Sequence, residues 1–200
     1  QEDVVNAREP GYGIKLLAIA KAAEGTLEAR VHPTMIPAAS PLAAVSGVFN
    51  AVFMTGDNVG DLMFYGRGAG QLPTASAVWS DVLDIARRVA HGLPALAVDL
   101  PGHGAAALPI RPMDDIRTAY YLRVMALDRP GTLAQVAGHL GQHGISIVSV
   151  LQKRRAERHE AVPIVMMTHE ARERDMRAAL AAIDKLPVVA SPTTMIRVEA

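Results

Sequence analysis

The stretch Asp128-Arg129-Pro130-Gly131-Thr132-Leu133 limits the possible folds of this chain more than any other. Before it, residues 120–127 alternate in the manner of a strand, and after it apolar residues recur at the spacing of a helix face. Gly144 ends this predicted helix, and residues 145–150 are typical of the next strand. The Pro-Gly turn therefore leaves backbone N–H groups at a helix N-terminus, where the carboxylate of an amino acid can bind.

The remainder of this segment predicts a βαββαβ order from about residue 118 to 200. Residues 162–168 form an apolar run in which Pro163 indicates an edge strand, residues 176–183 a second helix, and residues 194–199 a closing strand. With its turn and the Gly144-Ile145-Ser146-Ile147 step, the segment resembles an ACT domain, a regulatory module that binds amino acids. The resemblance implies a small amino-acid effector. We expect its carboxylate near the N–H groups of Gly131 and Thr132, with a hydrogen bond from Ser146.

Composition excludes several classes of function. Lys plus Arg equals Asp plus Glu at 20 each, which argues against binding nucleic acid through phosphate contacts. The chain has no cysteine, so disulfides and thiolate metal sites are excluded. No apolar run is long enough for a membrane span, and residues 1–9 show no signal sequence. We therefore expect a cytoplasmic protein with no nucleic-acid, membrane or metal partner.

A segment rich in proline and glycine divides the chain. Residues 91–117 have poor periodicity, and we interpret them as a connection with one short strand at 95–100. The predicted organisation is residues 1–105, a linker at 106–117, and the ACT-like domain at 118–200. The expected fold class is α+β, with an incomplete layer of mostly antiparallel strands and helices before the βαββαβ domain.

A glycine-rich loop, Gly66-Arg67-Gly68-Ala69-Gly70, joins a predicted strand to a predicted helix in the first part. Such a loop lets a backbone approach a ligand closely, but it is also an ordinary strand-to-helix turn with Thr74 or Ser76 as the helix cap. Its spacing is not that of a dinucleotide fingerprint, because the last required glycine is displaced. Local chemistry alone favours the ordinary turn.

Several ordered blocks over residues 3–88 resemble bacterial homoserine dehydrogenases. They are Gly11–Ala20, Val31–Thr34, Pro41–Ala43, Gly47–Val52, Met63–Gly70, Pro73–Val78 and Asp84–Arg87. Members of that family also often carry a C-terminal ACT domain. The resemblance implies NAD(P)-dependent interconversion of L-homoserine and L-aspartate 4-semialdehyde, in threonine and methionine biosynthesis, with feedback by an amino acid for which threonine is the first candidate.

The resemblance covers only the later part of the family's sequence. The family's nucleotide-binding domain and catalytic acid and lysine residues are expected upstream of Gln1, so no catalytic residue is assigned here. We expect the 200-residue chain alone to be inactive. The alternative hypothesis is an amino-acid sensor that is not an enzyme and uses only its ACT-like part. The preference for NAD or NADP is expected to be determined by residues of the upstream nucleotide-binding domain.

The resemblance also places part of a cofactor site in the glycine-rich loop. Gly70 is the best candidate for contact with NAD or NADP, and Gly68, Ala69 and Thr74 are weaker ones. The strands within residues 45–65 resemble the family's dimer and substrate layer, which implies a homo-oligomer, with a dimer as the expected form.

Other polar groups have ordinary interpretations. His139 and His143 have the spacing of a metal pair, but no third ligand is nearby in sequence, so we expect solvated side chains. The basic run at residues 153–158 is interpreted as the tip of a hairpin. Asp81 and Asp84 are expected on a solvated helix face.

Overall fold

The computed structural model describes residues 2–93, 107–152 and 161–199. The helices are α1 (Glu2–Arg8), α2 (Gln71–Ala90), α3 (Thr132–Gln142) and α4 (Glu173–Ile183), with 3-10 turns η1 (Pro41–Ala44) and η2 (Met113–Asp115). The strands are β1 (Tyr12–Ala23), β2 (Thr26–Pro37), β3 (Phe49–Gly56), β4 (Gly60–Arg67), β5 (Arg117–Leu127), β6 (Ile147–Gln152), β7 (Ala161–Thr168), β8 (Ala171–Arg172) and β9 (Val189–Val198).

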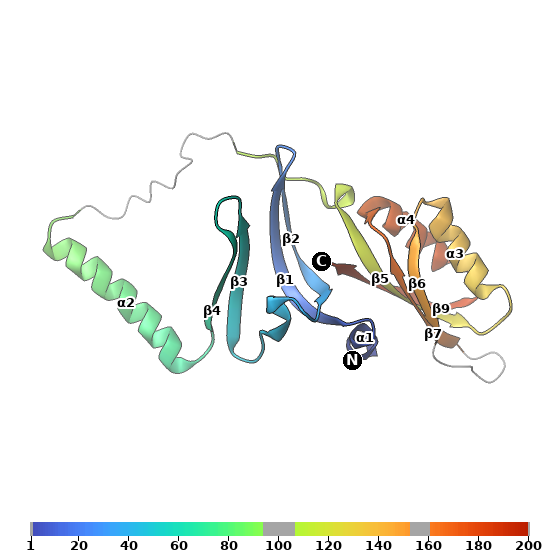
Figure 1. Ribbon diagram of the computed structural model, residues 1–200, viewed down its shortest axis with the longest axis horizontal. Helices are drawn as coiled ribbons and strands as arrows, with labels where there is room; N and C mark the ends of the chain where they lie inside the picture. Colours follow the sequence, from blue (N-terminus) through green and yellow to red (C-terminus); the bar gives the residue numbers. More distant parts are fainter. Residues whose placement is uncertain (1, 94–106, 153–160, 200) are drawn as a thin grey trace. The chain divides into compact units, whose positions relative to one another are not determined.

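The predicted βαββαβ order is present from β5 to β9, and the α+β class is confirmed (Figure 1). The predicted strand at 95–100 and the basic hairpin tip at 153–158 lie outside the described residues. The chain forms two compact units, one of residues 1–39 with 108–200 and the other of residues 40–107. These units cross the division expected from the sequence, because the first 39 residues pack with the ACT-like part.

A continuous sheet explains that packing. In the first unit the strand order is β1-β2-β9-β5-β7-β6, with β8 paired to β5. Strands β1 and β2 form a long antiparallel hairpin, and β2 pairs in parallel with β9 through Thr34 with Arg197 and Met35 with Val198. The ACT-like sheet is therefore extended by two strands from the other end of the sequence.

Two cores lie on opposite faces of this sheet. Helices α3 and α4 cover one face, where Leu122, Val136, Leu140, Met176 and Ile183 are fully buried. This is the apolar stripe that the sequence periodicity predicted. On the other face, the residue Ala7 of α1 packs with a cluster of apolar side chains from four strands: Met35, Tyr121, Val165, Met167 and Val198.

Polar contacts fix α1 to that second face. Asp3 accepts hydrogen bonds from Arg123 Nε at 2.6 Å and from the Tyr121 hydroxyl at 3.0 Å. The hydrogen bond from Arg123 holds the pKa of Asp3 below its ordinary value, although burial opposes this. Burial raises the pKa of Tyr121 to about 12, so its hydroxyl remains a donor at neutral pH.

The predicted linker includes residues that pack into the first unit. Ile116 is fully buried. The backbone N–H of Arg111 donates to the Leu27 carbonyl at 2.8 Å, and the Leu27 N–H donates to the Pro109 carbonyl at 2.9 Å. Residues 109–116 therefore form part of the edge of the folded unit rather than a free connection.

Two sequence interpretations of individual strands are corrected. Pro163 indicated an edge strand, but β7 lies between β5 and β6. Pro163 is paired with Met125 of β5, and the described pairs between β6 and β7 run from Thr168 to Ile164. The apolar run at residues 14–20 favours a buried strand, yet the side chain of Leu16 is 73% exposed within this chain.

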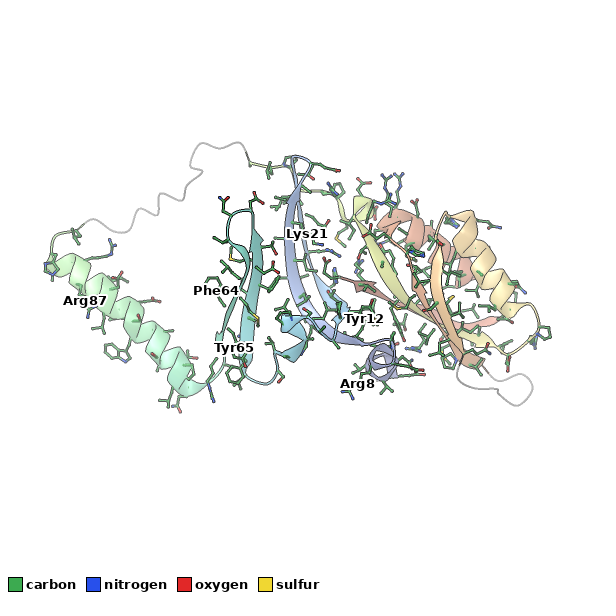
Figure 2. The ribbon with its side chains drawn as sticks, in the orientation of Figure 1. Arg8, Tyr12, Lys21, Phe64, Tyr65 and Arg87 are labelled. Carbon is green, nitrogen blue, oxygen red and sulfur yellow. The ribbon has the colours of Figure 1, made fainter. Side chains whose placement is uncertain are left out.

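The second unit contains the β3–β4 hairpin and α2. The side chains of β4 are exposed, including Phe64 and Tyr65 (Figure 2). Tyr65 stacks on Phe49 with ring centroids 4.9 Å apart, and the Arg67 guanidinium lies 5.3 Å from the Phe49 ring centroid. The apolar residues of α2, such as Trp79 and Val89, are also exposed within this chain. No helix among the described residues is long and apolar enough to cross a membrane.

Candidate functional site

The Asp128–Leu133 turn forms one wall of a pocket of about 400 Å³. The pocket lies between the end of β5, the first turns of α3, and the strands β6 and β7. Its lining is Leu127, Asp128, Arg129, Gly131, Thr132, Leu133, Ala134, Ala137, Gln152 and Ile164. The pocket thus combines a carboxylate, a guanidinium and an amide with an apolar wall, which suits a small zwitterion with a short side chain.

Gly131 gives the turn its shape. It is the N-cap of α3 and has φ of +88°, a left-handed conformation that side chains with Cβ rarely adopt. The dipole of α3 and its first-turn N–H groups favour an anion at this end of the helix. The structure thus places Gly131 at the pocket, where the sequence expected it.

Thr132 contributes to the turn differently from expectation. Its side chain is buried, its hydroxyl donates to the Leu127 carbonyl at 3.0 Å, and its N–H donates to the Arg129 carbonyl at 3.2 Å. These bonds fix the turn and occupy both donors. Leu133 and Ala134 follow in the first turn, where no intrahelical acceptor exists, so they are better donors for a carboxylate.

Ser146 does not lie with the other predicted effector residues. Its side chain is exposed, it is not among the residues that line the pocket, and its carbonyl accepts from the His169 N–H at 2.9 Å. Gln152, which the sequence reasoning missed, does line the pocket, and its amide lies 3.4 Å from the Asp128 carboxylate. Its place at the end of an apolar strand gave no local signal.

The glycine-rich loop lies in the second unit, between β4 and α2. Gly70 is the N-cap of α2 and has φ of +129° and ψ of 148°, a region that only glycine adopts easily. Its carbonyl accepts from the Thr74 N–H at 3.1 Å. A branched side chain at Gly70 would therefore strain the backbone as well as fill space, so Gly70→Val cannot separate cofactor contact from folding.

The backbone N–H groups of Gly68 and Ala69 are hydrogen-bonded to the segment before β3. Both N–H groups donate to the Val48 carbonyl, at 3.1 and 3.4 Å. A Cβ at Gly68 would lie 1.6 Å from Nδ2 of the exposed Asn50 side chain of β3, which would have to rotate away. Gly68, Ala69, Gly70 and Thr74 are all exposed, and the N-terminus of α2 that adjoins Gly70 is suited to a phosphate or another anion.

The packing role of Gly68 predicts a pair of compensating substitutions. Gly68→Ala should reduce hydrogen-exchange protection of β3 by about 0.5–1 kcal/mol, because the new methyl forces the Asn50 side chain out of its present rotamer. Adding Asn50→Ala should restore most of it, since the Asn50 Cβ lies 3.5 Å from the added carbon. Gly66→Ala is the matched control, because no atom lies within 4 Å of its added Cβ. Equal losses for Gly68→Ala and Gly66→Ala would contradict this role.

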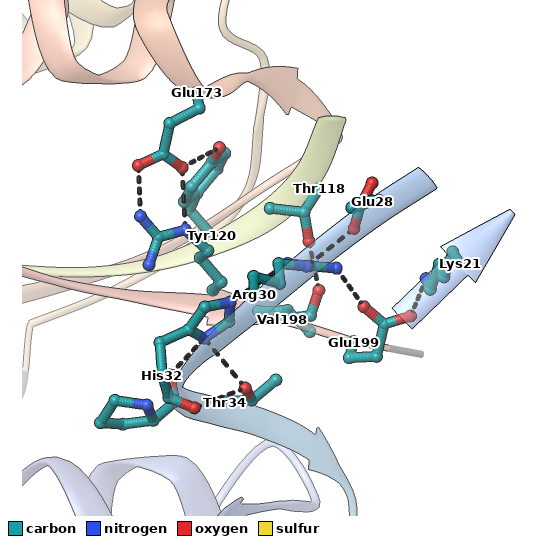
Figure 3. A network of polar contacts seen from close by, with 12 residues as sticks. Lys21, Glu28, Arg30, His32, Thr34, Thr118, Tyr120, Glu173, Val198 and Glu199 are labelled. Carbon is teal, nitrogen blue, oxygen red and sulfur yellow. Dashed lines mark hydrogen bonds and ion pairs between the residues drawn. The ribbon is translucent and has the colours of Figure 1, made fainter. Parts of the chain in front are cut away.

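A buried polar cluster lies where β2 meets the ACT-like part (Figure 3). Glu173, the first residue of α4, is fully buried and accepts from the Tyr120 hydroxyl at 2.9 Å, from Arg177 Nε at 2.9 Å and from Arg197 Nε at 2.9 Å. Burial would raise the pKa of Glu173, but these donors outweigh it and hold the pKa below its ordinary value.

The cluster continues onto the inner face of β2. Arg30, whose side chain is 2% exposed, donates to Glu199 Oε2 at 2.6 Å, and Glu199 also pairs with Lys21 of β1. Arg30 Nε lies 2.7 Å from Glu28 Oε1 without the geometry of a hydrogen bond, so this contact is an ion pair only. His32 lies beside Arg30, and burial lowers its pKa, which favours the neutral ring.

The histidine pair has no metal geometry. His143 Nδ1 lies 2.9 Å from the His139 carbonyl, at the C-terminus of α3, and both side chains are half-buried rather than solvated. Among the described residues, no group of three His, Asp or Glu side chains is placed to hold a metal ion. Asp81 and Asp84 lie on an exposed face of α2, where Asp84 pairs with Arg88.

The fold and the turn pocket define a chain with an ACT domain, and residues 120–188 match the ACT domain family. Residues 1–83 match the homoserine dehydrogenase family. The chain is 47% identical to the homoserine dehydrogenase of Neisseria gonorrhoeae over 201 residues and 43% identical to that of Pseudomonas aeruginosa over 204 residues. Each match covers 98% of this chain and 46% of the relative.

A solved structure gives the same result. The crystal structure of a homoserine dehydrogenase from Thiobacillus denitrificans matches 99% of this chain and 45% of that chain, with a TM-score of 0.82 and 43% identity. The chain therefore spans about half the length of the relatives it matches. It belongs to the homoserine dehydrogenase family, as a C-terminal region that includes an ACT domain.

Proposed function

We propose that this chain is the C-terminal part of an NAD(P)-dependent homoserine dehydrogenase, which interconverts L-homoserine and L-aspartate 4-semialdehyde. The identity to homoserine dehydrogenases along almost the whole chain supports this proposal. In it, the nicotinamide cofactor supplies the hydride chemistry, and the loop ending at Gly70 borders the cofactor with the N-terminus of α2.

We expect the 200-residue chain alone to show no turnover, since it spans 46% of the length of its relatives. The measurement is NAD(P)H formation from L-homoserine by the purified chain and by the whole protein that contains it. Turnover by the whole protein but not by the chain is the expected result. Turnover by the isolated chain at the rate of the whole protein would contradict the expectation that the catalytic residues lie in the part of the whole protein outside this chain. An inactive whole protein would instead support an amino-acid sensor that is not an enzyme.

The ACT domain is proposed to bind a small amino acid as a feedback effector, with L-threonine as the first compound to test. The observation that carries this is the pocket at the Asp128–Leu133 turn. The ammonium group would pair with Asp128, and the carboxylate would meet the first-turn N–H groups at Leu133 and Ala134. The apolar wall of Leu127 and Ile164 leaves room for a short side chain. A second copy of the chain is the proposed partner.

Filling the pocket should abolish effector binding without loss of folding. Ala137→Leu places a larger side chain into the pocket from α3 and keeps a good helix former, so we expect affinity for L-threonine to fall by about 100-fold or more. Gln135→Leu is the matched control, because it adds the same side chain to an exposed position of α3 outside the pocket lining. Calorimetric titration of the whole protein measures both, and unchanged affinity in Ala137→Leu would place the effector elsewhere.

A further inference from the structure

The β1–β2 hairpin has an unusual division of its two faces. Between residues 28 and 34 of β2 the buried side chains are the polar ones, Glu28, Arg30, His32 and Thr34, and the apolar Met35 and Ile36 are buried after them. The opposite face carries Leu16 and Val31, which are 73% and 70% exposed within this chain. Over residues 28–34 the hairpin is thus attached to the ACT domain through charges and hydrogen bonds, and the apolar contact of Met35 with Tyr121 and Val198 follows at the end of β2.

The backbone contribution to this attachment is short. Strands β2 and β9 share two register pairs, and the Glu199 N–H donates to the Met35 carbonyl at 2.9 Å just beyond them. By contrast, β5 pairs with β9 and with β7 along most of its length. Side-chain ion pairs therefore act together with the apolar contact of Met35 to hold the hairpin in register with the ACT domain.

Each carboxylate of the cluster joins elements from different parts of the fold. Glu173 joins α4 to β5 and β9 through Tyr120 and Arg197, and Glu199 joins the end of β9 to both strands of the hairpin through Arg30 and Lys21. A buried charge that loses its partner is strongly unfavourable, so such pairs tend to be made or broken together. Loss of one partner would therefore weaken the junction at several elements at once.

The effector pocket and the cluster share the same strand and core. Leu127, at one end of β5, lines the pocket, and Tyr120, nearer the other end, donates to Glu173. Ile164 lines the pocket and belongs to the same core as Tyr120 and Met176 of α4. A ligand that repositions the pocket wall therefore acts on a packed group of residues that also positions Glu173.

We propose that Arg30, Glu173, Arg197 and Glu199 form a latch that couples the effector pocket to the β1–β2 hairpin. The latch holds β2 beside β9. Occupancy of the pocket changes the stability of that attachment, and the hairpin carries the change out of the ACT domain. Glu173 and Glu199 are positioning residues in this scheme, because they act through the two arginines. The ligand part of the inference rests on the proposed effector function.

The test is hydrogen exchange of the whole protein, wild type beside Glu199→Gln, with and without L-threonine. Glu199→Gln removes the charge that pairs with buried Arg30, at a side chain that is 22% exposed and so tolerates the change. We expect exchange at residues 28–36 to rise about tenfold while residues 122–126 of β5 change less than about twofold. Asp175→Asn is the matched control, since it removes a carboxylate from the exposed Arg174 pair on α4.

L-Threonine should change exchange at residues 28–36 in wild type but not in Glu199→Gln, while it protects residues 127–134 in both. Protection of the pocket without a change at residues 28–36 of wild type would overturn the coupling. A variant with wild-type exchange at residues 28–36, or with equal increases throughout the unit, would overturn the latch. If L-threonine protects nothing, the ligand part fails together with the proposed effector, and the ligand-free comparison still decides whether these ion pairs hold β2.

Discussion

A fragment that begins at residue 118 should be at least about 3 kcal/mol less stable than the same residues within the whole first unit. The fragment keeps the α3 and α4 core but loses α1 and the hairpin, which re-exposes Tyr121, Val165 and Val198 on the other face. Full burial of each such side chain contributes roughly 1.5–3 kcal/mol, so partial exposure of several exceeds the loss of any one surface contact. Arg123 also loses Asp3 as its partner.

The measurement is the free energy of opening of β5 amides from native-state hydrogen exchange. The matched control joins residues 1–39 to 108–200 through a glycine-serine linker of about 20–25 residues, long enough to span the length of β2, which restores the first unit without residues 40–107. This joined chain should recover most of the stability. If the fragment is as stable as the joined chain, then the contacts of α1 and β2 contribute little to the ACT domain.

The sequence predicted the helices and strands of the ACT domain because their apolar residues follow regular periods. Leu133, Val136 and Leu140 fall on one face of α3, and Gly144 with φ of +69° ends it as expected. The loop at Gly70 was also found, since glycine marks conformations that other residues avoid. Local periodicity and backbone chemistry are properties of short segments, and a single sequence displays them.

The pairing of β2 with β9 could not be predicted in this way. Alternation along β2 identifies a strand, but it favours burial of Leu27, Ala29 and Val31, and the structure buries Glu28, Arg30 and His32 instead. Arg30 pairs with Glu28 and with Glu199, and Glu199 is 169 residues from Arg30 in sequence. Compensation between distant charges leaves no periodic signal. For the same reason no sequence pattern indicates that Glu173 is buried.

The largest effect of a single substitution is expected at Glu173. Glu173→Ala should lower the free energy of opening of β5 by about 3–5 kcal/mol, because it leaves Arg197 without its buried partner. Asp175→Asn, at the exposed position two residues later, should change it by less than about 0.5 kcal/mol. Native-state hydrogen exchange of the whole protein measures both variants.

Two further comparisons separate the charge from the packing. Replacement of both partners, as Glu173→Leu with Arg197→Met, should recover much of the loss, since a buried ion pair can be exchanged for apolar side chains at little cost. The pKa of Glu173 lies below its ordinary 4.5 in the folded state, so its contribution is complete above that pH and declines as the pH falls through the lowered value. The penalty of Glu173→Ala should therefore shrink in acid. A penalty that is the same in acid as at neutral pH, and is not relieved by the double substitution, would show that the carboxylate's volume matters and its charge does not.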